Sequence, residues 1–302
     1  MSLTDVPIGC VPILWNNADL LDLAPATPGD VVLDEIARIG FDGTQHGRGL
    51  PEGEVLREAL AQRGLRFAEL YSALPAGPDG LIGRAADIAR RDLARLTVAG
   101  GEVLVVAIDG GGARQQWAGR VADGAPRWPP KALDELTGLL AELAAAAPDG
   151  VKVAFHPHAA TWIETPDEVE ALADRLGGTG AGLCLDVGHY VVGGGNPVDA
   201  IDRYRELLMH VHLKDVDHAV LARLRAGGVP DFGAAVRDRI FTELGNGVLD
   251  LGGVIAAFDR IGYRGWLMVE QDSSWLAPSE AAAVGKRVLE YARRVAVRGA
   301  AA

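Results

Sequence analysis

Short apolar runs alternate with longer segments of helical period along almost the whole chain, and this alternation is what most restricts the fold. Val103–Ile108 is a continuous apolar run of the kind that is buried on both faces of a parallel sheet. The predicted strands are 8–14, 41–44, 66–71, 103–108, 151–155, 182–185, 207–213 and 265–269, and the predicted helices are 30–39, 54–63, 81–99, 131–147, 167–176, 198–205, 251–261 and 279–295. Eight alternating pairs favour an α/β fold of the (β/α)8 barrel type over an open, doubly wound sheet.

The length of 302 residues fits one barrel of roughly 250 residues with loop insertions. We therefore expect a single domain over 1–302, with a frayed tail at 298–302. Two stretches, 109–130 and 216–249, do not follow the alternation. Both follow predicted strands, so we expect them at the rim where barrel active sites lie, as substrate covers.

Composition restricts the partners and the location of the protein. A net charge of −12 without a basic stripe argues against nucleic acid. No apolar run approaches 18 residues and no signal peptide is visible, so no membrane partner is expected. Cys10 and Cys184 lie in apolar runs, which predicts reduced, buried thiols in a cytoplasmic protein. A homo-oligomer remains open.

Polar side chains that can bind a metal stand at the ends of four consecutive predicted strands. They are His156, His158, Asp186, His189, His210, His212, Lys214 and Glu270. Parallel strands deliver their ends to one barrel mouth, so these side chains should converge. Imidazole with carboxylate suits Mn, Co, Fe, Ni or Zn, whereas an all-oxygen set suits Mg or Ca. Within 207–213 the period of two puts His210, His212 and Lys214 on one face, and His212 near the rim is the preferred ligand.

Each of these residues alone has a structural explanation. A single histidine at a strand end is more often hydrogen-bonded than metal-bound. Asp186 alone could cap the following turn, and Glu270 alone could pair with an arginine. Their joint occurrence at four strand ends favours a metal site. Trp15, Trp162 and Trp275 lie just past strand ends, where stacking on a sugar-like ring and packing within loops are equally weighted.

Several segments resemble a known superfamily. LCLDVGH (183–189), HVHLKD (210–215) and GYRGWLMVE (262–270) are similar to the xylose-isomerase-like sugar isomerases and epimerases, which are metal-dependent TIM barrels. Further segments resemble the inosose dehydratases, which act on 2-keto-myo-inositol in inositol catabolism. These are PILWNNADL (12–20), GFDGTQHGRGLP (40–51), FHPHAATWIET (155–165) and GNGVLD (245–250).

The resemblance implies metal ligands at Asp186, His212 and Glu270. Epimerases of the superfamily supply a fourth ligand, a glutamate of the fifth strand, where this chain has Ala-Phe-His. His156, His158 and Glu164 are the alternatives, and Glu164 is our predicted fourth ligand. Mn or Co is the expected ion, with Fe, Zn and Mg also allowed.

The substrate implied by the resemblance is a small polyhydroxylated ketone. Asn16 and Gln45 join the three tryptophans as predicted substrate contacts. Gln45-His46 departs from the Thr-Glu-Leu-Gly pattern that is usual in inosose dehydratases, and this departure bears on the substrate rather than on the metal.

The implied reaction is the dehydration of a keto-inositol through an enediolate, with a divalent ion stabilising the negative charge on the ketone oxygen. A base removes the α-proton and an acid helps the β-hydroxyl leave. His156, His158 and His189 are candidates for these transfers. Lys214 is expected to donate to the oxyanion or, if burial lowers its pKa, to act as a base.

Three alternatives stay open. A sugar isomerase or epimerase would begin with the same deprotonation, although the missing strand-five glutamate favours the dehydratase. A non-catalytic sugar-binding barrel would not need the metal-binding residues. An endonuclease of the related barrel family would need a basic groove, which the net charge disfavours.

Overall fold

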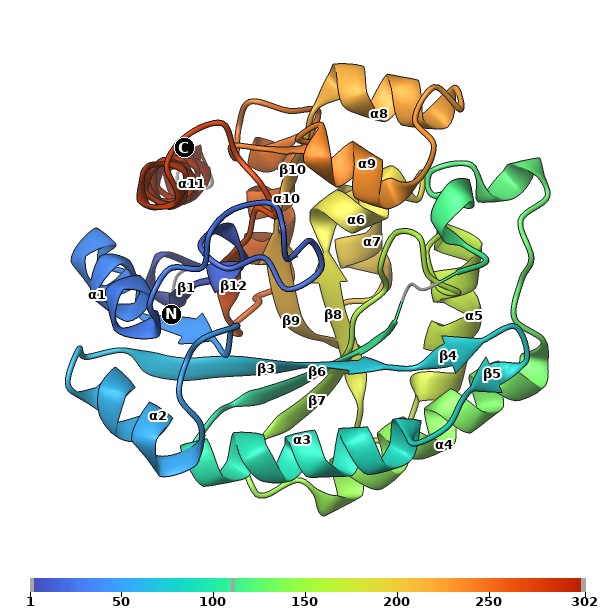
Figure 1. Ribbon diagram of the computed structural model, residues 1–302, viewed down its shortest axis with the longest axis horizontal. Coiled ribbons are helices and arrows are strands. Elements are labelled where there is room, and N and C mark those ends of the chain that lie inside the picture. The colour runs from blue at the N-terminus through green and yellow to red at the C-terminus, as the bar shows by residue number, and fades with distance from the viewer. Residues whose placement is uncertain (1–2, 110–111, 300–302) are drawn as a thin grey trace.

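Eight parallel strands close into a barrel in the computed structural model, which describes residues 3–109 and 112–299 (Figure 1). In barrel order the strands are β1 (Ile8–Cys10), β12 (Leu267–Val269), β9 (Leu208–Leu213), β8 (Gly182–Asp186), β7 (Lys152–Phe155), β6 (Val103–Ile108), β3 (Arg66–Leu74) and β2 (Gly43–Gln45). The predicted (β/α)8 barrel is confirmed.

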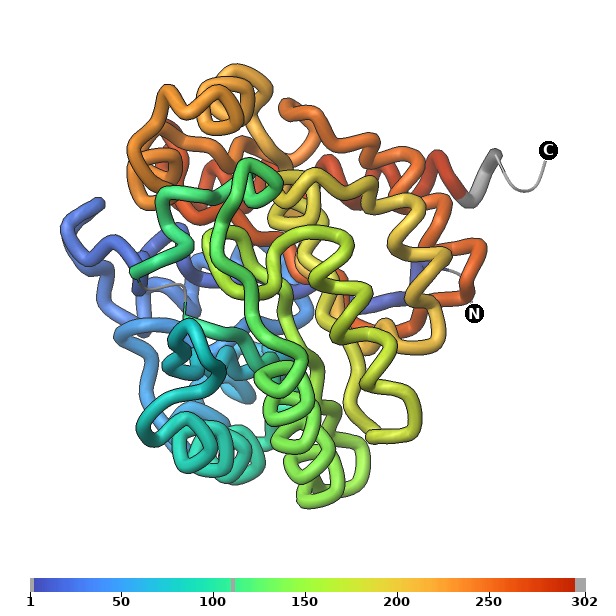
Figure 2. The backbone as a smooth tube through the Cα atoms, turned by 90° about the vertical axis from the view of Figure 1, so that its right-hand side faces the viewer, coloured from blue at the N-terminus to red at the C-terminus, as the bar shows by residue number. Residues whose placement is uncertain are grey.

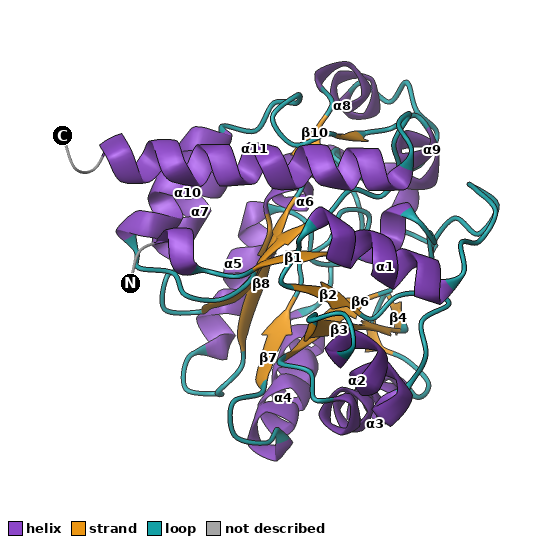
Figure 3. Ribbon diagram, turned by 90° about the vertical axis from the view of Figure 1, so that its left-hand side faces the viewer, coloured by secondary structure: helices purple, strands orange, loops and turns teal. Residues whose placement is uncertain are grey.

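Helices surround this barrel (Figure 3). The longer ones are α1 (Gly29–Ile39), α2 (Gly53–Ala61), α3 (Ala85–Ala99), α4 (Pro130–Ala146), α5 (Pro166–Leu176), α10 (Leu251–Arg260) and α11 (Pro278–Gly299). The shorter ones are α6 (Val187–Val192), α7 (Pro197–Arg203), α8 (His218–Arg225) and α9 (Phe232–Arg237). Helix α11 extends to Gly299, into the segment expected to be frayed, and the rest of that segment lies outside the described residues.

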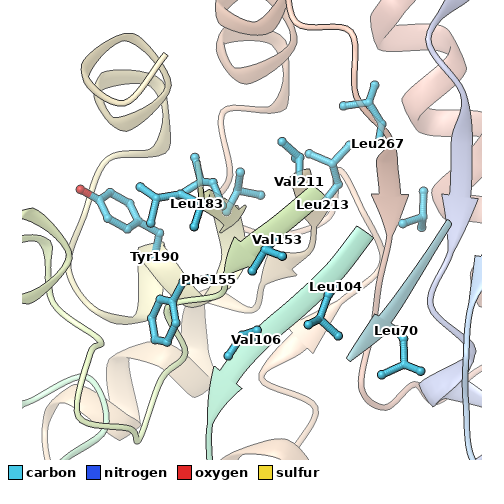
Figure 4. Packing of buried hydrophobic residues seen from close by; sticks show 14 of the residues in the cluster. Leu70, Leu104, Val106, Val153, Phe155, Leu183, Tyr190, Val211, Leu213 and Leu267 are labelled. Atoms are coloured by element: carbon cyan, nitrogen blue, oxygen red, sulfur yellow. The ribbon is translucent and has the colours of Figure 1, made fainter. Parts of the chain in front are cut away.

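Alternate side chains of each strand face the helices or the barrel interior. In β6, Leu104 and Val106 belong to the outer core against the helices (Figure 4). Val103 and Val105 belong to a separate cluster inside the barrel. The predicted burial of this strand on both faces is confirmed. The apolar residues of a strand fix which of its positions face the barrel interior. They therefore also fix the direction of the polar side chains at the end of that strand.

Two predicted elements have different bounds in the structure. The first strand stops at Cys10, because Pro12 begins a 3-10 turn, η2 (Pro12–Leu14). The helix predicted from residue 81 begins at Ala85, because Gly83 has φ 59° and precedes the helix. Residues 76–81 instead form a two-stranded hairpin, β4 (Ala76–Gly77) with β5 (Gly80–Leu81).

The two stretches that break the alternation both follow strands, as predicted. After β6 come the 3-10 turns η3 (Gln115–Trp117) and η4 (Val121–Asp123); residues 110–111 of this stretch lie outside the described residues. The β9–α10 insertion (residues 216–249) contains α8, α9 and the strand β11 (Phe241–Thr242), which pairs with β10 (Asp215–Val216). Figure 2 shows the insertion and the loop after β6 on one side of the molecule. Both cysteines are buried and unpaired, and no helix of the described chain is long and apolar enough to cross a membrane.

Trp266 fills the amino-terminal end of the barrel, and two glycines make room for it. A Cβ at Gly43 would lie 2.6 Å from the indole and 2.6 Å from the carbonyl oxygen of Arg66, and a Cβ at Gly9 would lie 3.3 Å from the indole. The Arg66 guanidinium stacks 4.5 Å above the indole ring, whose Nε1 donates to Glu102. The end opposite the polar strand termini is therefore closed by packing.

We predict that Gly43→Ala lowers the free energy of unfolding by about 1–3 kcal/mol, because the added methyl group overpacks the barrel. Gly138→Ala is the matched control: it lies exposed within α4 with no atom near the new Cβ, and better helix propensity should stabilise it by about 0.5–1 kcal/mol. Urea denaturation measures both changes. Equal effects of the two substitutions would contradict the packing argument.

Candidate metal centre and active site

Side chains from four neighbouring strands meet at the mouth of the barrel. His156 follows β7, Asp186 ends β8, His212 lies near the end of β9 and Glu270 follows β12. One nitrogen or oxygen atom from each lies within 4.8 Å of those of the others. The three ligands implied by the sequence thus lie together, and a histidine joins them.

Asp186 divides its two oxygens between two tasks. Oδ1 accepts the backbone N–H of His189 at 2.9 Å and caps α6. Oδ2 has no hydrogen-bond partner among the described residues and lies 3.6 Å from His156 Nε2 and 3.9 Å from His212 Nδ1. Capping of α6 by Oδ1 and metal binding by Oδ2, which were alternatives from the sequence, are therefore compatible.

The ring of His212 presents its two nitrogens to two carboxylates. Nε2 forms a 2.9 Å hydrogen bond with Oε2 of Glu69. Nδ1 lies 2.6 Å from Oε2 of Glu270, but neither atom has a partner of hydrogen-bond geometry in the described chain. A buried polar atom without a partner costs about 1–3 kcal/mol. Three such atoms, with Asp186 Oδ2, face one another, so these residues fit a divalent cation.

A lysine lies against the same carboxylates. Lys214 Nζ is 2.8 Å from Asp272 Oδ1, 3.0 Å from Glu270 Oε1 and 3.4 Å from Asp186 Oδ2. Burial alone would lower the pKa of Lys214, but Asp186, Asp272 and Glu270 raise it well above its usual range. The ammonium form is thus retained, which is opposite to the shift that a base would require.

The carboxyl groups divide into two classes. Burial raises the pKa of Asp186 and Glu270, but surrounding cations, led by Lys214, outweigh burial and lower both values. Burial dominates at Asp272 and raises its pKa to about 7. The site therefore combines two ionised carboxylates with a carboxyl group whose pKa is about 7.

The mouth opens into a cavity with two adjoining lobes of about 580 and 260 Å³. Asp19, Tyr71, His158 and Asp272 line both lobes. The larger lobe extends to α9 of the insertion and to residues that follow β6. The smaller lobe is also lined by Glu270, His156, Gln45, His46 and Asn16. Both stretches predicted to lie at the rim thus contribute to the cavity wall.

His158 is the sequence-predicted proton-transfer residue that the cavity exposes most fully. Its Nδ1 lies 2.6 Å from the carbonyl oxygen of Ala159, which can only accept, so Nε2 is left as an acceptor. Burial, together with His156 and Lys214, lowers the pKa of His158 to about 3 and keeps the ring neutral. His189 stacks on this ring at 3.7 Å between centroids and contacts Lys214 Nζ at 3.1 Å.

The comparisons with known proteins agree with this architecture. A family model described as "Xylose isomerase-like TIM barrel" matches residues 33–292. The chain belongs to this family. Over 291 residues it is 31% identical to an inosose dehydratase of Clostridium botulinum (strain Alaska E43 / Type E3), which covers 94% of this chain and 96% of the relative.

Two further known proteins are similar to this chain over nearly its whole length. The rhizopine catabolism protein MocC of Rhizobium meliloti is 32% identical over 310 residues, covering 99% of this chain and 91% of the relative. A solved L-ribulose 3-epimerase has a TM-score of 0.72 at 18% identity, covering 98% and 97% of the two chains. At that identity the epimerase supports the fold alone.

Glu164, the predicted fourth ligand, is not in the cluster of this xylose isomerase-like protein. Its Oε1 accepts the N–H of Gly119 and its Oε2 that of Ala160, both at 2.7 Å. Ala160 has φ 64°, a conformation that is unfavourable for a residue with a Cβ. The carboxylate therefore stabilises the loop after β7, while His156 lies in the cluster, 3.6 Å from Asp186.

The predicted aromatic contacts do not line the cavity. Trp15 is buried and donates to Glu35, and Trp162 is buried and stacks on Trp128. Trp275 is 80% exposed, with the Arg239 guanidinium 4.3 Å from its ring. Trp15 and Trp162 therefore follow the packing alternative, whereas Trp275 lies on the surface away from the cavity lining. Asn16 and Gln45 do line the smaller lobe.

Four residues near the centre were missed from the sequence: Asp19, Glu69, Tyr71 and Asp272. Asp272 carried a signal, because it follows Glu270 by two residues and so shares the parity of the strand end. Glu69 and Tyr71 lie in the predicted strand 66–71, but they face inward because of an irregularity in the pairing of β2 with β3 that the sequence does not mark. Asp19 lies in a loop, and no spacing in the sequence places it.

We predict that His156→Ala abolishes retention of a stoichiometric divalent ion, as do His212→Ala and Glu270→Gln, because each removes a converging donor atom. Metal content after dialysis measures the loss, and far-ultraviolet circular dichroism checks the fold. Glu164→Gln is the control and should retain the ion, with a lower melting temperature from the weakened loop. Retention by His156→Ala with loss by Glu164→Gln would restore Glu164 as the ligand.

Proposed function

We propose that the protein is a metal-dependent lyase that dehydrates a keto-inositol or a similar polyhydroxy ketone through an enediolate. The observation that carries this proposal is the convergence of His156, Asp186, His212 and Glu270, of which His156 and Glu270 line the smaller lobe of the cavity. The inosose dehydratase relative, 31% identical over 94% of the chain, supports the choice of reaction. The rhizopine catabolism relative supports a role in catabolism.

The donor set suits a first-row divalent ion. Two imidazole nitrogens and two carboxylate oxygens favour Mn, Co, Fe or Zn over Mg, and we propose Mn or Co. When bound, such an ion supplies Lewis-acid stabilisation of negative charge on the ketone oxygen. A cytoplasmic location, suggested by the free cysteines, stays a prediction, as does a homo-oligomer.

The charge of the cavity wall supports an uncharged, hydroxyl-rich substrate. Four aspartates line the lobes: Asp19, Asp109, Asp231 and Asp272. Arg48 is the arginine that contributes to the described lining. Carboxylates accept hydrogen bonds from hydroxyl groups but repel a carboxylate or phosphate of a substrate. The wall thus favours a neutral polyol over an acidic sugar.

Two residues are placed to move protons. His158 offers Nε2 as an acceptor in the cavity, and we assign it to removal of the proton α to the ketone. Asp272 lines both lobes and burial raises its pKa to about 7 despite the nearby Lys214 ammonium, and we assign it to protonation of the leaving hydroxyl. The C–H and C–O bonds break, a C=C bond forms and water leaves. Lys214, which does not line the lobes, positions this carboxyl group and is itself in contact with His189.

We predict that the Mn²⁺- or Co²⁺-loaded protein converts 2-keto-myo-inositol, with loss of one water, to a hydroxy-enone that is the enol of a 1,2-dione; the reaction is followed by the appearance of the ultraviolet absorbance of this conjugated product. Chelation should abolish the reaction and added metal should restore it. Glu270→Gln is the inactive control. Turnover of a ketohexose without loss of water, and none of the keto-inositol, would favour the isomerase or epimerase alternative. Binding of a sugar without any turnover would favour the non-catalytic barrel.

His158→Phe should retain the metal ion but lower kcat by roughly 10²- to 10⁴-fold, the usual contribution of a proton-transfer residue. Phenylalanine preserves the packing against His189 and Phe232. Trp275→Ala, a surface change, should leave both kcat and KM unchanged. Steady-state kinetics with parallel metal analysis measures these effects; an unaltered kcat in His158→Phe would remove this residue from the proposed mechanism.

A further inference from the structure

A buried glutamate inside the barrel has no part in the reaction proposed above. Glu69, in β3, is fully buried among the interior side chains, and none of its atoms lines the cavity. A buried carboxylate is costly unless it is paired, so its partners indicate its purpose. Both partners lie across the barrel, on β9: His210 and His212.

The contacts of Glu69 determine how His212 is presented. Oε2 lies 2.9 Å from His212 Nε2 in a hydrogen bond and 2.5 Å from His210 Nε2. An ionised carboxylate only accepts, so His212 donates from Nε2. A neutral ring that carries its hydrogen on Nε2 has its lone pair on Nδ1, the atom 2.6 Å from Glu270 and 3.9 Å from Asp186.

A β-bulge turns Glu69 toward the barrel interior. Thr44 of β2 pairs with Phe67 and the next residue, Gln45, pairs with Glu69, so Ala68 is an extra residue. Phe67 packs in the outer core against the helices. With regular alternation Glu69 would have faced the helices too, and the bulge re-aims it.

A second bulge does the same for His210. Leu183 of β8 pairs with Leu208 and Cys184 pairs with His210, which leaves Met209 as the extra residue. Leu208 packs against the outer core, so regular alternation would have placed His210 outside the barrel. Two independent irregularities therefore bring the two polar groups into contact.

We propose that Glu69, held by His210, is a positioning residue that fixes the imidazole of His212 with Nδ1 toward the metal centre and thereby sets the metal affinity. This inference rests on the proposed metal centre. A second ion between Glu69, His210 and His212 is the competing explanation, because their donor atoms also lie within 4.8 Å of one another. The hydrogen bond occupies His212 Nε2 and argues against it, since a nitrogen that donates a proton cannot bind an ion.

The test compares Co²⁺ affinity and stoichiometry by chelator competition, with the visible absorption of bound Co²⁺ as a readout of the ligand arrangement. Glu69→Leu removes the acceptor at similar volume and should weaken Co²⁺ binding roughly 10- to 100-fold, the usual effect of losing a partner of a histidine ligand. Glu69→Gln retains an acceptor oxygen and should fall between Glu69→Leu and the wild type. The absorption bands should shift in Glu69→Leu.

Asp92→Asn is the matched control. Asp92 is also buried and bonded to β3, through Ser72, but lies on the helix side of the strand, so its substitution should leave Co²⁺ affinity unchanged. Should Glu69→Leu fail to fold, Glu69→Leu/His210→Leu replaces both members of the pair by apolar groups and should show the same loss.

Four outcomes would overturn the inference. These are wild-type affinity in Glu69→Leu, equal losses in Glu69→Leu and Asp92→Asn, unchanged absorption bands, and two Co²⁺ per wild-type chain with one in Glu69→Leu, which would show a second ion site instead. Absence of Co²⁺ binding by the wild type is a different failure, because it would overturn the metal centre itself. None of these readouts depends on turnover of a keto-inositol.

Discussion

The structure depends on several carboxylates that are buried close together at the mouth of the barrel. Asp186, Glu270 and Asp272 gather around the single ammonium of Lys214, and Glu69 lies beyond them between two histidines. Such a group is tolerated only when cations and hydrogen bonds compensate it. The atoms that remain uncompensated face one another, and this remainder defines the place for a divalent ion.

In the barrel, the position of a residue along its strand decides whether its side chain faces the interior or the helices. Cys184 and Asp186 face inward together, as do His210 and His212, while Leu183, Leu185, Val211 and Leu213 face the helices. The apolar core and the polar site are therefore two faces of the same strands. Where parity alone would send a polar group outward, as for Glu69, an extra residue in the strand corrects it.

Much of this arrangement could be predicted from the amino-acid sequence. Strand and helix positions followed from periodicity, which also gave eight polar residues at strand ends; the resemblance to the superfamily then selected Asp186, His212 and Glu270 among them. The sequence could not show that the Glu164 carboxylate accepts two backbone N–H groups and lies apart from the cluster that contains His156, because these contacts depend on the fold of the loop after β7.

Other features could not be predicted because they depend on long-range contacts. Trp15 and Trp162 lie next to strand ends in sequence, but their partners, Glu35 and Trp128, draw them into the core. The pairing of Glu69 with His212 spans 143 positions and requires a bulge, which leaves no mark in hydrophobic alternation. Helices α6, α8 and α9 were missed because they interrupt the alternation of strands and helices on which the prediction depended.

The loop after β7 has a mechanical consequence for catalysis. Ala159 and Ala160, next to His158, belong to the same apolar cluster as Ala118, Phe232 and the rest of the insertion's core. Glu164 ties this loop to Gly119 as well. His158 is therefore attached to a packed unit that includes Phe232 and Val236 of α9, which line the larger lobe of the cavity. A displacement of α9 is transmitted to the imidazole of His158. Substrate entry and the orientation of the proposed base are therefore linked through one packed unit.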